Sequence, residues 1–158
     1  FKLEGSRELH AALQSYKPWS FEQWKELNRQ LQAWDDHGGD FQHYTFKEGA
    51  AILRAQKQNI ASMLKLARNC RITGSAGYVD GLALNAPIHQ SEIGHELANQ
   101  SSTYGLVWYL SADNLAKCSL RSNGDYDVSA IARAFGGGGH RNAAGFEVDI
   151  DTLLEWLV

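Results

Sequence analysis

The first part of the chain carries its apolar residues at helical spacing. Between residues 45 and 68, apolar positions recur every three or four residues, which predicts one long amphipathic helix. Residues 20–23 and 45–48 both fit the capping box, in which the first and fourth side chains satisfy each other's backbone donors at a helix start. A shorter helix is expected over residues 7–16. The polar and glycine-rich residues 35–40 predict a loop between the second and third helices.

Beyond residue 69 the apolar residues follow the period of a β-strand, most clearly within residues 115–121. The apolar face of that segment holds Ala116, Cys118 and Leu120, and its polar face holds Lys117, Ser119 and Arg121. Short apolar or β-branched runs bounded by glycines or polar turns predict further strands, and helices are predicted between some of them. The expected strands are residues 71–75, 78–84, 105–110, 115–121 and 146–148, and the expected helices are residues 91–99, 128–135 and 150–158.

Turn and cap residues agree with this order of elements. The pair Asp113-Asn114 is typical of a hairpin turn, and Asp127 is a suitable N-cap for the helix that follows it. The order of elements favours an α/β fold with a mixed β-sheet flanked by helices. We therefore expect two domains: an α-helical connector over residues 1–68 and an α/β domain over residues 69–158.

Charge is unevenly divided between the two parts. Residues 1–68 hold 10 Lys+Arg and 8 Asp+Glu, whereas residues 69–158 hold 5 and 10, a net charge of -5. Because the second part is acidic, a bulk positive field cannot be the basis for binding a polyanion. The hydrophobic fraction of 44% and the charged fraction of 21% exclude a disordered tail, a collagen-like repeat and a polybasic arm.

Compartment and membrane association follow from a few features. Cys70 and Cys118 are too few and too far apart for a disulfide framework or a Cys-x-x-Cys zinc site, so the reducing cytoplasm is the expected location. The chain has neither an apolar run long enough to span a bilayer nor a signal segment, and no membrane partner is expected. It opens on Phe1, which suggests a chain cut from a longer one.

Four consecutive glycines, residues 136–139, are the strongest candidate for a functional feature. Ordering them costs more conformational entropy than ordering almost any other tetrapeptide, and a close backbone approach to a ligand would explain their presence. Their N–H groups can converge on an anion, with donors added by His140 and Arg141. The alternative is a loop that leaves the preceding helix with Gly136 at its C′ position. One glycine would suffice for that, so a ligand-binding loop is favoured. The run matches neither a P-loop nor a Rossmann fingerprint.

Residues 136–146 closely resemble the signature of the DHH-associated domain, the C-terminal half of DHH-family phosphoesterases. The resemblance extends to residues 84–87, 91–97, 119–122 and 127–132, and the helical part is similar to the connector that follows the metal-binding DHH domain. It implies hydrolysis of phosphodiester or phosphomonoester bonds in short single-stranded nucleic acids, in cyclic-dinucleotide products or in 3′-phosphoadenosine phosphate. In this family a pair of Mn²⁺ ions, held by the DHH domain, activates water at the scissile phosphate.

The resemblance implies that this chain is the half that grips the substrate. The backbone of Gly137, Gly138 and Gly139, together with His140, would bind a phosphate or a terminal nucleotide. Arg121 would pair with a substrate phosphate. Four further polar residues complete the candidate substrate-binding set: His95, Ser119, Arg141 and Asn142. The implied partners are short single-stranded RNA or DNA, or nucleotide phosphates, and the N-terminal DHH domain of the same protein. No cofactor is expected in this chain, and Mn²⁺ is expected in the DHH domain.

The metal half of the family has no counterpart in this sequence. We find no Asp-His-His sequence, and Asp35-Asp36-His37, even with His43 nearby, is interpreted as a solvated loop between helices. The chain is therefore expected to be inactive by itself. Two alternatives stay open: an RNA-binding or dimerising module like the C-terminal domain of alanyl-tRNA synthetases, whose glycine run is similar, and a stand-alone interaction domain.

Overall fold

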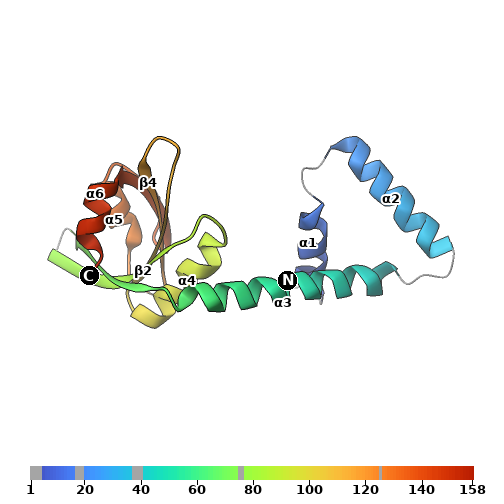
Figure 1. Ribbon diagram of the computed structural model, residues 1–158, viewed down its shortest axis with the longest axis horizontal. Coiled ribbons are helices and arrows are strands. Elements are labelled where there is room, and N and C mark those ends of the chain that lie inside the picture. Colours follow the sequence, from blue (N-terminus) through green and yellow to red (C-terminus); the bar gives the residue numbers. More distant parts are fainter. Residues whose placement is uncertain (1–4, 17–19, 37–40, 75–76, 125) are drawn as a thin grey trace. The chain divides into compact units, whose positions relative to one another are not determined.

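The computed structural model describes residues 5–16, 20–36, 41–74, 77–124 and 126–158 (Figure 1). The chain divides into two compact units, Phe1–Asn59 and Ile60–Val158, and each is described by itself. Within the described ranges, no helix is both long and apolar enough to cross a membrane.

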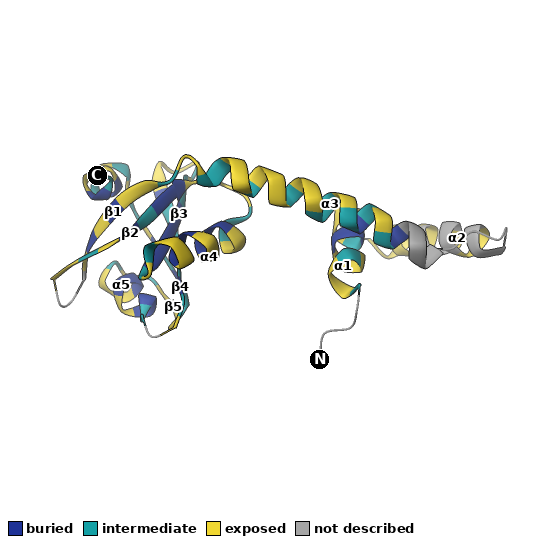
Figure 2. Ribbon diagram, turned by 90° about the horizontal axis from the view of Figure 1, so that it is seen from below, coloured by how far each residue is buried: buried dark blue, intermediate teal, exposed yellow. Residues whose placement is uncertain are grey.

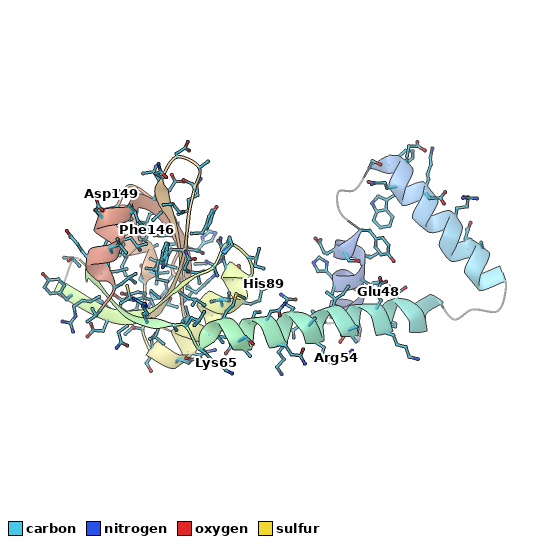
Figure 3. All side chains as sticks on the ribbon, in the orientation of Figure 1. Glu48, Arg54, Lys65, His89, Phe146 and Asp149 are labelled. Atoms are coloured by element: carbon cyan, nitrogen blue, oxygen red, sulfur yellow. The ribbon has the colours of Figure 1, made fainter. Side chains whose placement is uncertain are left out.

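The first unit consists of helices α1 (Ser6–Ser15), α2 (Phe21–Asp36) and most of α3 (Phe41–Leu64). Helices α1 and α3 approach closely at the buried Gly49, where a Cβ atom would overlap the Glu8 carbonyl oxygen. The Tyr16 hydroxyl adds a hydrogen bond of 3.2 Å to Glu48, which Figure 3 labels on α3. Glycine at this crossing therefore allows two backbones to touch.

One of the two predicted capping boxes is confirmed. The Ser20 backbone N–H donates to Gln23 Oε1 at 2.7 Å, and the Gln23 backbone N–H donates to Ser20 Oγ at 3.1 Å. The second box is wrong as a helix start, because α3 begins at Phe41 and Thr45 is a buried residue inside it. Nothing between Phe41 and Thr45 is a helix breaker, so the helix extends beyond the box.

The predicted loop at residues 35–40 is also wrong at its first two positions, because α2 continues through Asp36. Residues 37–40 lie outside the described residues. The long helix α3 ends at Leu64 and not at residue 68, since Arg68 already pairs with Ala83 in the sheet.

The second unit is built on one mixed six-stranded sheet, which confirms the predicted α/β fold. The strand order is β1-β2-β3-β4-β6-β5, with β2 and β3 parallel and every other pair antiparallel. Helix α4 is the crossover between the two parallel strands. The strands are β1 (Arg68–Gly74), β2 (Gly77–Asn85), β3 (Tyr104–Leu110), β4 (Leu115–Ser122), β5 (Gly138–His140) and β6 (Ala143–Asp149), and the helices are α4 (Gln90–Ser101), α5 (Val128–Ala134) and α6 (Ile150–Trp156).

Helices cover both faces of this sheet (Figures 1 and 2). Helices α5 and α6 pack on one face, where Leu106 and Leu120 are completely buried. Helix α4 and the last turn of α3 pack on the other face, around Val107. The β4 alternation is as predicted, since the Leu120 side of the strand is buried in the first layer. The Arg121 side is therefore free to carry polar chemistry next to α4.

Two aspartates cap helices in this unit, one of them as predicted. Asp127 accepts from the Ser129 backbone N–H at 2.9 Å, and Asp149 accepts from the Thr152 backbone N–H at 2.8 Å. Hydrogen bonds from Ser129 lower the pKa of Asp127, and hydrogen bonds from Thr152 lower the pKa of Asp149. Both caps are therefore stronger when the carboxyl is ionised.

We expect the stability of the α/β unit to fall in acid, because the carboxylates of Asp127 and Asp149 become protonated there. Their folded pKa values lie below the unfolded value of about 3.9. Their contribution is present above that pH and is lost as the pH falls through the folded pKa. Thermal unfolding of Asp127→Asn and Asp149→Asn from pH 7 to pH 2 should show a smaller acid loss than wild type. Glu155→Gln, an exposed carboxylate of α6 away from the first turn, is the control. An unchanged acid slope in both cap variants would contradict this account.

Candidate functional site

Three of the four consecutive glycines are needed by the fold itself. Gly136 has a φ of 76° and lies at the C′ position of α5, as the loop interpretation expected. The Gly136 N–H donates to the Arg133 carbonyl at 3.1 Å and the Gly137 N–H to the Ala132 carbonyl at 2.9 Å, which is a Schellman motif. A Cβ at Gly137 would overlap the backbone of β6. Gly139 has a φ of 143°, and its Cβ would also meet β6.

Gly138 differs from the other three, because its φ is not positive and a Cβ there would meet nothing within 4 Å. The run is not a free loop. Residues Gly138–His140 form the edge strand β5, which sequence reasoning missed, and all three are exposed. Glycine suits this strand because its backbone lies very close to β6. Gly138 is thus the position in the run whose open side a ligand could approach.

The registers of β4, β6 and β5 place several predicted residues on one face of the sheet. Residues directly opposite each other in antiparallel strands point to the same side. Two adjacent rows result, which we call the arginine row (Arg121, Ala143 and His140) and the glycine row (Ser119, Gly145 and Gly138). Cα atoms two strands apart are separated by about 10 Å. The residues in the middle of the two rows, Ala143 and Gly145, are small and half-buried, so no large side chain stands between the polar groups.

Arg121 is held in place by neutral groups. Its Nη1 donates to the Leu120 carbonyl at 2.9 Å and to Ser119 Oγ at 3.2 Å, and its Nη2 donates to Ser91 Oγ on α4 at 2.9 Å. In the part of the chain that the structure describes, no carboxylate pairs with this guanidinium. The charge is therefore oriented but not neutralised, which is the condition for attracting an anion.

Helix α4 makes room for the arginine through a glycine. A Cβ at Gly94 would stand 2.8 Å from Arg121 Cγ. A glycine inside a helix costs about 1 kcal/mol relative to alanine, so its presence here has a packing reason. The helix and the arginine side chain share this space, and any larger residue at position 94 would displace Arg121.

The other predicted residues have different surroundings. His140 and Arg141 are exposed at the end of β5, and His95 is exposed on α4. The Asn142 amide is used within the fold: its Nδ2 donates to Ser122 Oγ at 3.0 Å and to the Gly124 carbonyl at 3.1 Å. Asn142 therefore fixes the turn after β4.

A cavity of about 600 Å³ opens beside the glycine row. Of the predicted residues, Ser119 and Gly137 line it, and the others do not. The polar wall of the cavity is formed by the next row of residues on the same face of the sheet. We call it the lysine row: Tyr109, Lys117 and Glu147. Lys117 Nζ lies 3.0 Å from Glu147 Oε1, and this hydrogen bond raises the pKa of Lys117. Glu147 was not singled out from the sequence, although the alternation of residues 143–149 places it on the polar face.

The described residues offer little else with which to perform covalent or metal chemistry. Among them, no three His, Cys, Asp or Glu side chains gather where they could hold a metal ion. His37 lies outside the described residues. Cys70 and Cys118 are free and buried, and burial raises the pKa of Cys70 to about 11 and that of Cys118 to about 12. Buried thiols with such pKa values are poor nucleophiles at neutral pH. The arrangement is therefore suited to binding an anion on the open sheet face.

Known proteins are similar mainly to the second unit of this chain, which contains the β-sheet. Residues 83–157 match the DHHA1 domain family. A protein of Acanthamoeba polyphaga mimivirus whose function is not characterised is 44% identical over 68 residues, which cover 40% of this chain and 16% of the viral protein. The matched segment is thus a small part of that relative.

Two solved structures are similar to this chain at low sequence identity. The pGpG-specific phosphodiesterase PggH from Vibrio cholerae superposes with a TM-score of 0.50 and 11% identity, over 70% of this chain and 39% of that chain. An exopolyphosphatase-related protein from Bacteroides fragilis gives a TM-score of 0.42 and 17% identity, over 73% of this chain and 40% of that chain. This chain therefore spans about two fifths of the length of both proteins.

Proposed function

Because residues 83–157 form a DHHA1 domain, we propose that this chain is the substrate-binding C-terminal part of a DHH-family phosphoesterase. The proposed substrates are short single-stranded oligonucleotides or nucleotide phosphates. In this proposal residues 69–158 grip the substrate and residues 1–68 connect them to a DHH domain in the cytoplasmic parent protein. Mn²⁺ belongs to that DHH domain, and no step of the metal chemistry is assigned to this chain.

One observation carries the proposal: Arg121 is fixed by three neutral hydrogen bonds and faces the same side of the sheet as Gly138 and His140. A planar guanidinium can donate two parallel hydrogen bonds to a phosphate, and a histidine N–H can donate another. The open backbone at Gly138 lets a ligand lie against the sheet. These groups would orient a phosphate, and Arg121 would do so from the position that its hydrogen bonds already give it.

The charge distribution supports a short substrate. Residues 69–158 carry a net charge of -5, so a long polyanion would be repelled outside the arginine row. Affinity would come from a few aimed donors, and neutralising few phosphates gives a weak salt dependence. A dinucleotide or trinucleotide meets this condition better than a long strand.

The proposal is tested by titrating the chain with a fluorescent 5′-phosphorylated dinucleotide or trinucleotide RNA in Mn²⁺ buffer, while binding and cleavage are followed in the same tube. Binding without cleavage is the expected result. A failure to bind any phosphorylated dinucleotide or trinucleotide would contradict the proposed substrate class. Cleavage by the isolated chain would contradict the assignment of the metal chemistry to a separate DHH domain.

His140→Ala should weaken this binding about fivefold, because one hydrogen bond of about 1 kcal/mol is lost. Fluorescence anisotropy measures the dissociation constant of both proteins. The matched control is His10→Ala, an exposed histidine on α1 in the other unit. Equal affinities for wild type and His140→Ala would remove His140 from the site.

A further inference from the structure

The cavity beside the lysine row is not accounted for by phosphate binding. The arginine row, the glycine row and the lysine row lie side by side on one face of the sheet. Successive rows are two residues apart along β4, which is about 7 Å. Ser119 connects the arginine row to the cavity, because its hydroxyl accepts a hydrogen bond from Arg121 and the residue also lines the cavity. A nucleotide whose phosphate lies on the arginine row can therefore extend its base across the bare glycine row into the cavity.

The cavity has the size and composition of a base-binding site. Its volume of about 600 Å³ lies within the range of small-molecule pockets. Tyr109 contributes a half-buried aromatic side chain, and such rings stack on nucleobases. Gly145 and Gly137 present backbone without side chains to the same space. The cavity thus combines an aromatic wall, an unobstructed floor and one charged pair.

We propose that this cavity is a subsite for a guanine base, read by Lys117 and Glu147. The inference rests on the proposed function, since it concerns the base of the same nucleotide. The Watson–Crick edge of guanine presents the acceptor O6 beside two donors, the N1–H and the N2 amino group. The Lys117 ammonium donates to O6, and the two oxygens of the Glu147 carboxylate accept from both donors. Adenine offers this pair only one donor and one acceptor, so it makes one charge-assisted hydrogen bond fewer.

Lys117 and Glu147 are available for this role. Their side chains are 42% and 48% exposed, and their mutual ion pair has an N–O distance of 3.0 Å. Exposed ion pairs contribute little to stability, so the two groups can turn to a ligand at small cost. Their cross-strand register, Lys117 opposite Glu147, keeps the donor and the acceptor side by side.

The test compares dissociation constants for four 5′-phosphorylated dinucleotides that carry guanine, hypoxanthine, adenine or no base. The guanine form should bind about tenfold more tightly than the adenine form, since one hydrogen bond to a charged group is worth at least that factor. Hypoxanthine lacks the N2 amino group and should bind less tightly than guanine. The form without bases should bind most weakly. This series needs no variant, so a folding defect cannot obscure it.

Glu147→Gln supplies the protein side of the test. A glutamine amide has one acceptor oxygen and no charge, so the variant should lose about tenfold or more in guanine affinity and a smaller factor in adenine affinity, because adenine donates only one hydrogen bond to Glu147. Glu155→Gln on α6, which removes an equal charge away from the cavity, should change neither. Equal affinities for all four ligands, or a preference for adenine, would overturn the guanine subsite. If the four ligands bound equally but binding still required Arg121, the proposed function would stand without the guanine subsite. A chain that binds none of the four would contradict both.

Discussion

Arg121→Ala is expected to weaken binding of a 5′-phosphorylated dinucleotide about 10-fold to 100-fold. The substitution removes the guanidinium of the arginine row, and a hydrogen bond to a charged group contributes about 1.5–3 kcal/mol. The loss is expected to exceed that of any other single polar residue on this face, because Arg121 carries a full charge that three neutral partners already orient. Anisotropy titration of wild type and variant under identical salt measures it.

Two further variants separate geometry from charge. Arg121→Lys keeps the charge but cannot reach Ser91 and Ser119 with a planar fork, so its affinity should lie between those of wild type and Arg121→Ala. Arg54→Ala removes an exposed arginine from the other unit and should bind as wild type does. If Arg54→Ala and Arg121→Ala lost affinity equally, binding would reflect net charge alone. The arginine row would then have no special role.

The polar face of β4 could be predicted from the sequence, because strict alternation of apolar and polar residues indicates a strand with one buried face. The face with Lys117, Ser119 and Arg121 is observed opposite the buried face, as the pattern required. The neighbours of that face could not be predicted, since register depends on pairing with distant strands. Nothing local indicates that Gly145 lies opposite Ser119 or that Glu147 lies opposite Lys117. The cavity depends on both pairings.

The glycine run shows a second limit of local reasoning. Its composition indicated a ligand-binding loop, whereas Gly136 ends a helix and Gly137 and Gly139 allow close contact with β6. Such contacts are made by a strand that follows later in the sequence, so no spacing within the run reveals them. The role of Gly138 in ligand binding stays a prediction. A similar limit applies at Thr45, where a correct capping motif lies inside a longer helix.

Gly105→Ala is expected to cause the largest loss of stability among the substitutions considered. Gly105 is buried on β3, and a Cβ there would overlap the Gly94 carbonyl oxygen and stand 2.6 Å from Leu97 Cβ. A backbone oxygen in a packed helix cannot move aside as a side chain can, so β3 and α4 must separate. Overpacking of this kind costs about 3 kcal/mol, and the melting temperature should fall by about 10 °C or more. Differential scanning calorimetry of the chain measures both quantities.

Gly94→Ala tests a neighbouring contact, between α4 and Arg121 on β4, and should lower affinity more than stability. Its Cβ would lie 2.8 Å from Arg121 Cγ and 3.3 Å from Arg121 Cβ, so the arginine stem must rotate and the guanidinium must move. Dinucleotide affinity should therefore fall, at a smaller cost in stability than a clash with backbone. Gly138→Ala, whose Cβ meets nothing, should leave the melting temperature unchanged. A melting temperature lowered as much in Gly94→Ala as in Gly105→Ala would mean that both glycines serve packing alone. Loss of affinity without loss of stability in Gly94→Ala would instead tie this helix glycine to the placement of the arginine.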